Sequence, residues 1–169
     1  MYNNKTIACV IPARMRSSRF PGKPLAKIND RELVLRVADI ANSAKYFDRL
    51  IIATEDDIIK ETVEKEGYEG MITSEHYTCT HRVAEVASKL TEDFIFNLQG
   101  DEPLTKSSDL DKIVEFGIDN DYDMVQPYRK STESDHEDAD VCQMTINNGK
   151  CTHMQRTPDT ITENLVSHI

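Results

Sequence analysis

Short apolar runs alternate along the chain with segments whose apolar residues recur at helical spacing. The runs are rich in β-branched residues, which is typical of strands buried on both faces of a parallel sheet. They lie at residues 6–11, 50–54, 70–73, 94–98 and 123–127. The helical segments lie between them, at residues 33–41, 58–63, 83–90 and 110–117. This alternation predicts an α/β fold, with a mostly parallel sheet and helices on both faces.

The character of the chain changes after Pro127. Residues 129–140 are polar and acidic, which predicts a loop. Residues 141–146 and 150–154 flank the turn signal Asn147-Asn148-Gly149, so we expect a C-terminal β-hairpin. The sequence therefore predicts one region over residues 1–128 and a second over residues 129–169. Because the last residues form an apolar run, we expect the chain to stop inside a structured region.

Charge is distributed very unevenly. The net charge is -10, which argues against a broad nucleic-acid surface. Yet the first 29 residues contain no Asp or Glu. The same stretch carries the cations Lys5, Arg14, Arg16, Arg19, Lys23 and Lys27. A cationic island on an acidic chain indicates a local anion site.

The chain lacks the signals of a secreted or membrane protein. No apolar run approaches the roughly 20 residues that cross a bilayer, and Met1 to Asn4 does not begin a secretory signal. The four cysteines show no framework spacing. We therefore expect a cytoplasmic protein with reduced thiols, no membrane partner and no nucleic-acid partner.

A loop rich in Pro, Gly and Arg follows the first predicted strand, from Ile11 to Leu25. Ligands of open parallel sheets bind beyond the carboxyl ends of the strands. Backbone N–H groups, arginine forks and a lysine there can wrap a triphosphate. The order of Gly22, Lys23 and Pro24 does not fit a Walker A loop. The alternative is a solvated basic loop.

A second polar segment, Asn97 to Pro103, follows the strand at residues 94–98. Asp101 is well placed there to hold Mg²⁺ against phosphate oxygens. Gln99 can exchange hydrogen bonds with a polyhydroxylated substrate. The alternative is an ordinary turn in which Asp101 is a turn former.

Together these segments resemble the 3-deoxy-manno-octulosonate (Kdo) cytidylyltransferases. That family reads I-P-A-R and then S-x-R-[LF]-P-G-K-P-L in the first loop, and N-[LV]-Q-G-D-E-P in the second, nearly as here. Ala53-Thr54-Glu55 resembles its A-T-D, with Glu for Asp. Residues 71–86 resemble its D-H-x-S-G-T-[DE]-R-x-A-E-V segment.

The resemblance implies an α/β fold of the nucleotide-diphospho-sugar transferase type, which is Rossmann-like. It implies an enzyme of lipopolysaccharide biosynthesis that couples CTP with a Kdo-like sugar acid, giving CMP-Kdo and pyrophosphate, with Mg²⁺ as cofactor. The anomeric hydroxyl of the sugar would attack the α-phosphorus in line. Residues 1–128 would then be the nucleotide-binding region. Residues 129–169 would begin, without completing, the sugar-binding and dimerisation region of a chain that is a homodimer at full length.

The resemblance also assigns residues by position. Arg14, Arg19 and Lys23 would hold the triphosphate, and Asp101 would hold Mg²⁺. Lys23, Arg14 and Asp101 are the catalytic candidates. The nucleotide-binding candidates are Pro12, Ala13, Arg14, Ser17, Arg19, Lys23, Thr78 and Arg82, with Arg82 near the base. Gln99, Arg156 and His168 would face the sugar acid.

Two further positions depart from the family pattern where the base is recognised. Cys79 replaces a glycine and His81 replaces an acid. These changes predict weaker or broader base selectivity, with CTP still preferred. They also leave open a related nucleotidyltransferase with another sugar or base. A non-catalytic nucleotide-binding paralogue is the alternative from a different class.

Overall fold

The computed structural model describes the chain except for residues 17–19, 133–134, 136–140, 148, 156–164 and 168–169. It forms two compact units, Met1–Asp121 and Tyr122–Ile169. The boundary between them lies a few residues before the predicted division at residues 128 and 129. The functional meaning of the two regions stays a prediction.

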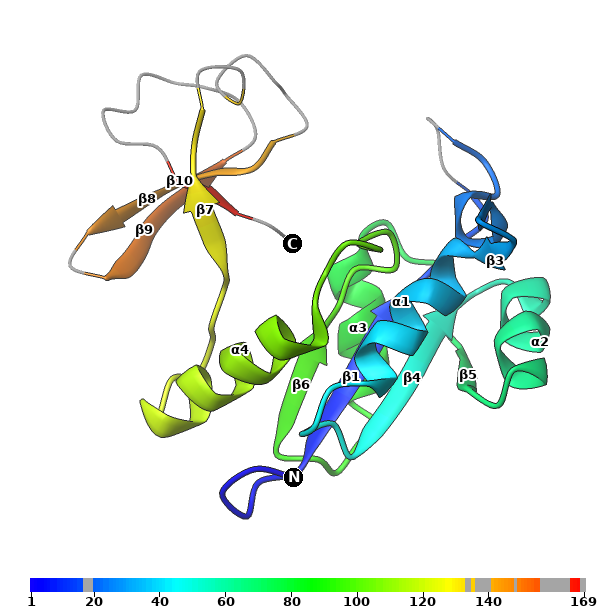
Figure 1. The fold of residues 1–169 in the computed structure, drawn as a ribbon, viewed down its shortest axis with the longest axis horizontal. Coiled ribbons are helices and arrows are strands. Elements are labelled where there is room, and N and C mark those ends of the chain that lie inside the picture. The colour runs from blue at the N-terminus through cyan, green and yellow to red at the C-terminus, as the bar shows by residue number, and fades with distance from the viewer. Residues whose placement is uncertain (17–19, 133–134, 136–140, 148, 156–164, 168–169) are drawn as a thin grey trace. The chain divides into compact units, whose positions relative to one another are not determined.

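The first unit is built on a four-stranded sheet of order β5-β4-β1-β6, in which every pairing is parallel (Figure 1). Its strands are β1 (Ile7–Pro12), β4 (Arg49–Thr54), β5 (Glu69–Ile72) and β6 (Phe94–Asn97). All six residues of β1 are buried, because this strand has a neighbour on each side and helices on each face. The predicted parallel sheet is confirmed.

Helices cover both faces of this sheet, as predicted. Alternate residues of β1 point to opposite faces. Cys9 and Ile11 pack in one core cluster with apolar residues of α1 (Leu33–Asn42), α2 (Asp57–Lys65) and α4 (Ser107–Asp119). Val10 packs in a second cluster with Val83 and Val86 of α3 (Cys79–Ala87). Figure 1 shows α1 and α3 on opposite sides of β1.

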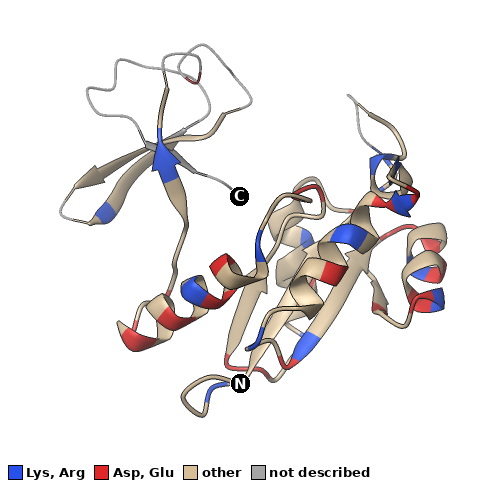
Figure 2. Cartoon of the chain, in the orientation of Figure 1, with Lys and Arg blue, Asp and Glu red and all other residues tan. Residues whose placement is uncertain are grey.

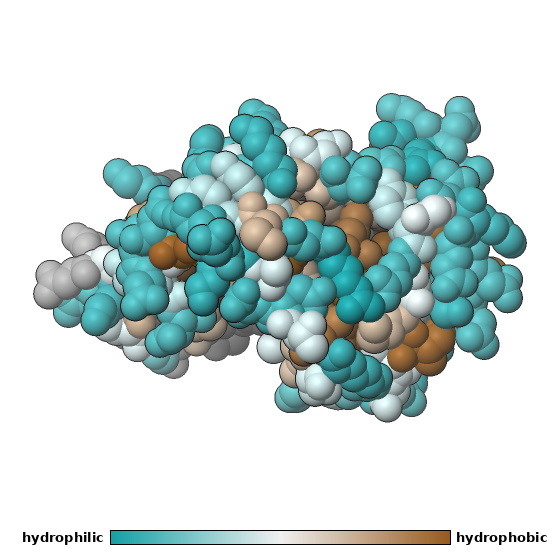
Figure 3. Space-filling model, turned by 90° about the horizontal axis from the view of Figure 1, so that it is seen from below, coloured by the Kyte–Doolittle hydropathy of each residue, from teal (hydrophilic) through white to brown (hydrophobic). Residues whose placement is uncertain are grey.

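The helices expose charge away from these cores. On α2 and α4, Asp and Glu outnumber Lys (Figure 2). Hydrophilic side chains dominate the face seen in Figure 3, where apolar residues form small separate groups. Among the described residues, none of the helices combines the length and apolarity that a bilayer crossing needs.

Three short elements lie between β1 and α1. They are the 3₁₀ turn η1 (Lys23–Leu25) and the two-residue strands β2 (Lys27–Ile28) and β3 (Arg31–Glu32). β2 and β3 pair antiparallel. The sequence did not indicate this small ribbon, since two-residue strands are too short to show a periodicity.

The second unit holds an antiparallel sheet of order β7-β10-β8-β9. Its strands are β7 (Tyr128–Lys130), β8 (Gln143–Asn147), β9 (Lys150–Gln155) and β10 (Leu165–Ser167). The predicted hairpin is confirmed as β8 and β9, with Gly149 at φ 75° in the turn.

The strand predicted at residues 123–127 is wrong, and β7 begins immediately after it. Pro127 cannot donate a ladder hydrogen bond. Residues 128–130 instead pair with β10, far along the chain. Because of this pairing, Arg129 and Lys130 belong to a strand, and the loop predicted for residues 129–140 is wrong at these two positions.

Candidate functional site

The candidate site lies where β1, β4 and β6 end. Parallel strands place their carboxyl ends at one edge of the sheet, so the segments that follow them meet there. The Ala13 amide donates to the Ala53 carbonyl (2.9 Å), and the Leu98 amide donates to the Val10 carbonyl (3.1 Å). The Met15 amide donates to Asp56 Oδ2 (2.7 Å). These bonds join the first predicted loop to the end of β4 and the segment after it, and they join the end of β6 to β1.

The first loop is closed at its base. The Gly22 amide donates to the Met15 carbonyl (2.8 Å). Gly22 itself has a φ of 76°, in the left-handed region that glycine adopts without strain. The turn η1 follows directly, with Pro24 buried. The backbone of Lys23 is therefore held at a defined place beside the site, although Ser17 and Arg19 lie outside the described residues.

Lys23 and Asp101 meet in this site. Lys23 Nζ lies 2.6 Å from Asp101 Oδ2, and the two side chains are 37% and 48% exposed. They belong to segments that follow the adjacent strands β1 and β6. A Cβ atom at Gly100 would lie only 2.8 Å from the Pro12 carbonyl oxygen. The absence of a side chain at Gly100 thus lets the Asp101 segment approach the end of β1, where Pro12 and the buried Ala13 lie.

The other cations of the N-terminal island also face partners from later in the chain. Arg14 Nη1 donates to the His76 carbonyl (3.4 Å), and Arg16 Nη1 lies 3.1 Å from Glu75 Oε1. In the described residues, Lys5 pairs with Asp93 and Lys27 with Glu32. The island predicted from the sequence is therefore largely neutralised in the folded protein.

The segment that receives Arg14 is anchored to α3 through Glu85. Glu85 Oε2 accepts from the Ser74 amide (2.9 Å) and lies 2.6 Å from His76 Nε2. Lys89 donates to the other carboxylate oxygen (2.8 Å). The hydrogen bonds from Lys89, His76 and Ser74 lower the pKa of Glu85 to about 2. The sequence reasoning gave Glu85 and His76 no role, although both occur in the quoted family pattern.

Arg82 is buried at 2% exposure beneath this segment. Its Nη2 forms an ion pair with Glu55, and its Nη1 donates to Thr73 Oγ1 (2.6 Å). The guanidinium thus joins α3 to the ends of β4 and β5. Contact between Arg82 and a base stays a prediction, and the contacts with Glu55 and Thr73 give Arg82 a positioning role.

The departures at Cys79 and His81 fall in the first turn of α3. Thr78 is the N-cap, and its Oγ1 accepts from the His81 amide (3.2 Å) and lies 3.0 Å from His81 Nδ1. Cys79 is the first helical residue. Both substitutions therefore alter the same helix terminus at the edge of the site.

The predicted sugar-facing residues are only partly described. Gln99 is half-buried, and its Nε2 donates to Asn97 Oδ1 (3.2 Å) at the end of β6. Arg156 and His168 lie outside the described residues. Their roles therefore rest on the family resemblance.

The donor set around Asp101 fits Mg²⁺ shared with a phosphate ligand. Among the described residues, no three His, Cys, Asp or Glu side chains gather as a metal cluster. Mg²⁺ commonly takes one or two carboxylates and completes its shell with substrate phosphates and water. An accessible carboxylate beside the Lys23 ammonium matches that pattern.

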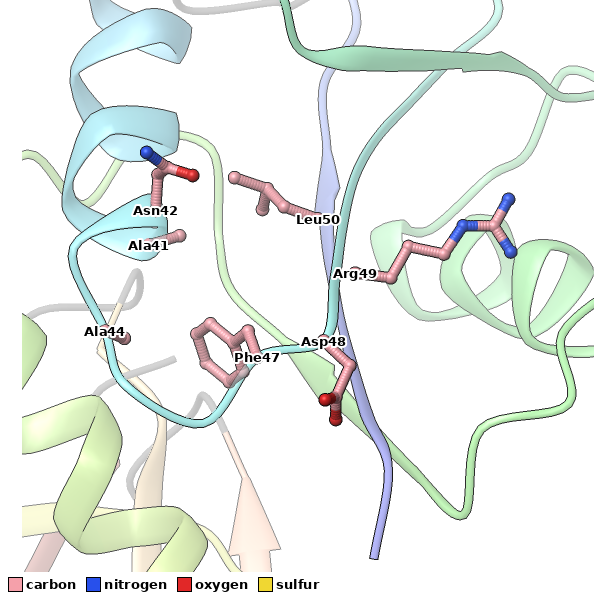
Figure 4. A pocket seen from close by; sticks show the side chains of 7 residues that line it. All are labelled: Ala41, Asn42, Ala44, Phe47, Asp48, Arg49 and Leu50. Atoms are coloured by element: carbon pink, nitrogen blue, oxygen red, sulfur yellow. The ribbon is translucent and has the colours of Figure 1, made fainter. Parts of the chain in front are cut away.

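A small hollow lies away from this site, at the amino ends of β1 and β4 (Figure 4). It is lined by Ala41, Asn42, Ala44, Phe47, Asp48, Arg49 and Leu50. The Asp48 carboxylate already accepts from the Ile7 amide (2.9 Å) and pairs with the N-terminal ammonium (2.8 Å). We therefore assign this hollow no part in the site.

A parallel sheet with helices on both faces and polar loops beyond its strand ends is the architecture of an α/β nucleotide-binding fold. The model of the family described as cytidylyltransferase matches residues 8–160. The chain belongs to this cytidylyltransferase family.

Two proteins with similar sequences are named as Kdo cytidylyltransferases. The chain is 34% identical over 162 residues to the 3-deoxy-manno-octulosonate cytidylyltransferase of Thermodesulfovibrio yellowstonii, covering 89% of this chain and 63% of that protein. It is 43% identical over 114 residues to the enzyme of that name from Acinetobacter baumannii, covering 65% of this chain and 45% of the relative. The chain thus spans less than two thirds of these relatives' lengths.

Among solved structures, the fold matches CMP:2-keto-3-deoxy-manno-octonic acid synthetase complexed with CTP, with a TM-score of 0.83 at 25% identity. The match covers 96% of this chain and 71% of that chain. A 4-diphosphocytidyl-2C-methyl-D-erythritol synthase shares the fold at a TM-score of 0.66 and 13% identity. The predicted α/β nucleotidyltransferase fold is confirmed.

Proposed function

We propose that this chain supplies the nucleotide-binding part of an enzyme that couples CTP with Kdo, giving CMP-Kdo and pyrophosphate. The meeting of Lys23 and Asp101 carries the proposal. Nucleotidyl transfer depends chiefly on positioning the reactants and neutralising phosphate charge. A lysine that can grip phosphate and a carboxylate that can hold Mg²⁺ lie together at the strand ends, on loops that match the Kdo enzymes' patterns.

In the proposed reaction, the anomeric oxygen of the sugar forms a bond to the α-phosphorus of CTP. The bond from that phosphorus to the pyrophosphate oxygen breaks in line, and the hydroxyl proton passes to solvent. Lys23 and Arg14, with Arg19 and Ser17, would hold the phosphate oxygens and stabilise the departing charge. Mg²⁺ bound through Asp101 would supply further charge neutralisation.

The remaining candidates would fix the two substrates. Pro12, Ala13 and Thr78 would line the nucleotide, with Arg82 positioning the segment beside its base. Gln99, Arg156 and His168 would face the sugar acid. The names of the relatives support Kdo as that acid. We further propose that the enzyme, at full length, acts as a cytoplasmic homodimer in lipopolysaccharide biosynthesis.

A second candidate rests on Cys79 and His81, which alter the first turn of α3. A changed helix terminus at the edge of the nucleotide site favours a nucleotidyltransferase with another base. A nucleotide-binding protein without turnover is the remaining alternative.

The test measures nucleotide binding first and turnover second. Titration calorimetry with each of CTP, UTP, ATP and GTP, in Mg²⁺, should show the tightest binding for CTP. Lys23→Ala should weaken the binding of CTP at least tenfold, which is a loss of about 1.4 kcal/mol in binding free energy. Lys27→Ala, which removes a charge paired with Glu32, is the matched control and should bind CTP as the parent does.

Pyrophosphate release with Kdo then separates the candidates. Release with CTP supports the proposal, and release with another nucleotide supports the second candidate. Binding of CTP without release, in a protein that carries the complete sugar-binding region, favours the non-catalytic alternative. Failure to bind any nucleoside triphosphate would refute the proposal.

A further inference from the structure

Lys23 forms an ion pair with Asp101, the carboxylate that the proposed function assigns to the metal. Its Nζ lies 2.6 Å from Asp101 Oδ2, well inside hydrogen-bond distance. A dication bound to Asp101 would stand next to this ammonium, and the two positive charges would repel each other. Metal binding at Asp101 and the observed Lys23 contact therefore compete.

The surroundings of Asp101 give a free metal ion little compensation. In the described residues, no cluster of three metal-binding side chains exists that could outweigh the lysine. Mg²⁺ also gives up its water reluctantly and rarely settles on a lone carboxylate. A metal ion arriving by itself would have to displace Lys23 from Asp101, and the described residues would offer it fewer than three clustered metal-binding side chains.

A triphosphate changes both sides of this competition. It offers Lys23 several anionic oxygens in place of one carboxylate, and it offers the metal further oxygen ligands. The ion pair is partly solvated, with side-chain exposures of 37% and 48%. Pairs of this kind contribute little to stability, so a charged ligand can separate them readily.

We propose that the Lys23–Asp101 pair keeps the metal site closed until a nucleotide arrives, so that the metal binds with the triphosphate or after it. Lys23 then changes partner, from the Asp101 carboxylate to the phosphate. This inference rests on the proposed function and adds an order of binding to it. It gives Lys23 a second role, which is to exclude free metal.

The two roles make opposite predictions for one substitution. Lys23→Met should weaken nucleotide binding, because a phosphate contact is lost. The same change should strengthen the binding of metal alone, because Asp101 becomes available. A lysine that only binds phosphate would produce the first effect without the second, and a structural lysine would weaken both.

The experiment uses Mn²⁺ as the probe, without nucleotide, and measures free Mn²⁺ by electron paramagnetic resonance. Lys23→Met should bind Mn²⁺ at least about fivefold more tightly than the parent. Lys23→Arg keeps the charge and should bind like the parent. Asp101→Asn in the Lys23→Met background should abolish the gain, which separates Asp101 from weak sites on the acidic surface.

Lys27→Met is the charge-matched control. It removes one cation from the same part of the chain, where Lys27 lies 3.4 Å from Glu32, outside the site. If Lys27→Met gains Mn²⁺ affinity as Lys23→Met does, or if Lys23→Met gains none, the proposal is overturned. Circular dichroism melting shows that each variant is folded, and Lys23→Gln provides a second neutral variant should Lys23→Met fail to fold.

Nucleotide titration separates failure of this inference from failure of the proposed function. If the parent binds CTP but Lys23→Met gains no Mn²⁺ affinity, the binding order is wrong and the function stands. If Lys23→Met gains Mn²⁺ affinity and no nucleotide binds the parent, the closed metal site is correct and the proposed function is wrong.

Discussion

Arg82 is buried against Glu55, and its second nitrogen bonds to Thr73, so one guanidinium ties α3 to the ends of β4 and β5. The charge of Arg82 is thus satisfied inside the first unit. This arrangement positions the first turn of α3 and the segment that receives Arg14. It also predicts which substitutions near the site destabilise the fold.

Removing Glu55 should destabilise the fold. Glu55→Ala leaves the Arg82 charge buried without its counterion, which typically costs about 3 kcal/mol or more. Glu55→Asp, the acid that the family pattern carries, should cost less because it keeps the charge. Urea unfolding measures both, and Glu61→Ala, at an exposed position of α2, is the control. Equal stabilities for Glu55→Ala and Glu61→Ala would contradict the role of the ion pair.

Gly100→Ala should disturb both stability and the site. Its Cβ would lie 2.8 Å from the Pro12 carbonyl, so the two loops must separate. We expect a loss of about 1–3 kcal/mol in unfolding free energy, as for other overpacked positions, together with weaker CTP binding. Gly67→Ala is the comparison: at φ 85° with open space around it, that change should lower stability and leave CTP binding intact. Unchanged CTP affinity in Gly100→Ala would show that the close approach does not position Asp101.

The Glu85 network predicts a pH dependence. The pKa of Glu85 is lowered to about 2 in the folded protein, chiefly by hydrogen bonds from Lys89, His76 and Ser74. A carboxyl with a depressed pKa stabilises the fold above its unfolded pKa, and the stabilisation is lost as the pH falls towards the folded value. The stability difference between the parent and Glu85→Gln should therefore shrink from about pH 5 down to about pH 2. Unfolding measured across that range checks this, and a difference independent of pH would contradict it.

The first turn of α3 should control base selectivity. Cys79→Gly with His81→Asp restores the family residues at both departures, and it removes the His81 ring from Thr78. We expect a sharper preference for CTP over UTP, measured as the ratio of the two affinities. Thr80→Ser, a small change in the same turn, is the control. If the double variant discriminates no better than the parent, neither residue influences the base.

Much of the first unit could be predicted from local patterns. The buried strands, the helical stripes and the order of elements all follow from residues close together in the chain, because burial imposes a period on each element. The segments that hold Lys23 and Asp101 were also evident, since strand-end loops of parallel sheets meet at one edge. Membership of the cytidylyltransferase family followed from the same segments.

The partners that these residues take depend on how the whole chain folds. Lys23 and Asp101 are 78 positions apart, and nothing local to either indicates the other. The resemblance placed Arg82 near the base, and the folded chain shows that its guanidinium also pairs with Glu55, 27 positions away. Residues 128–130 became a strand because β10 pairs with them. Composition and periodicity predict whether a segment forms a helix or a strand and which of its faces is buried. Ion pairs and strand pairing depend instead on which distant segments the packed sheet brings together.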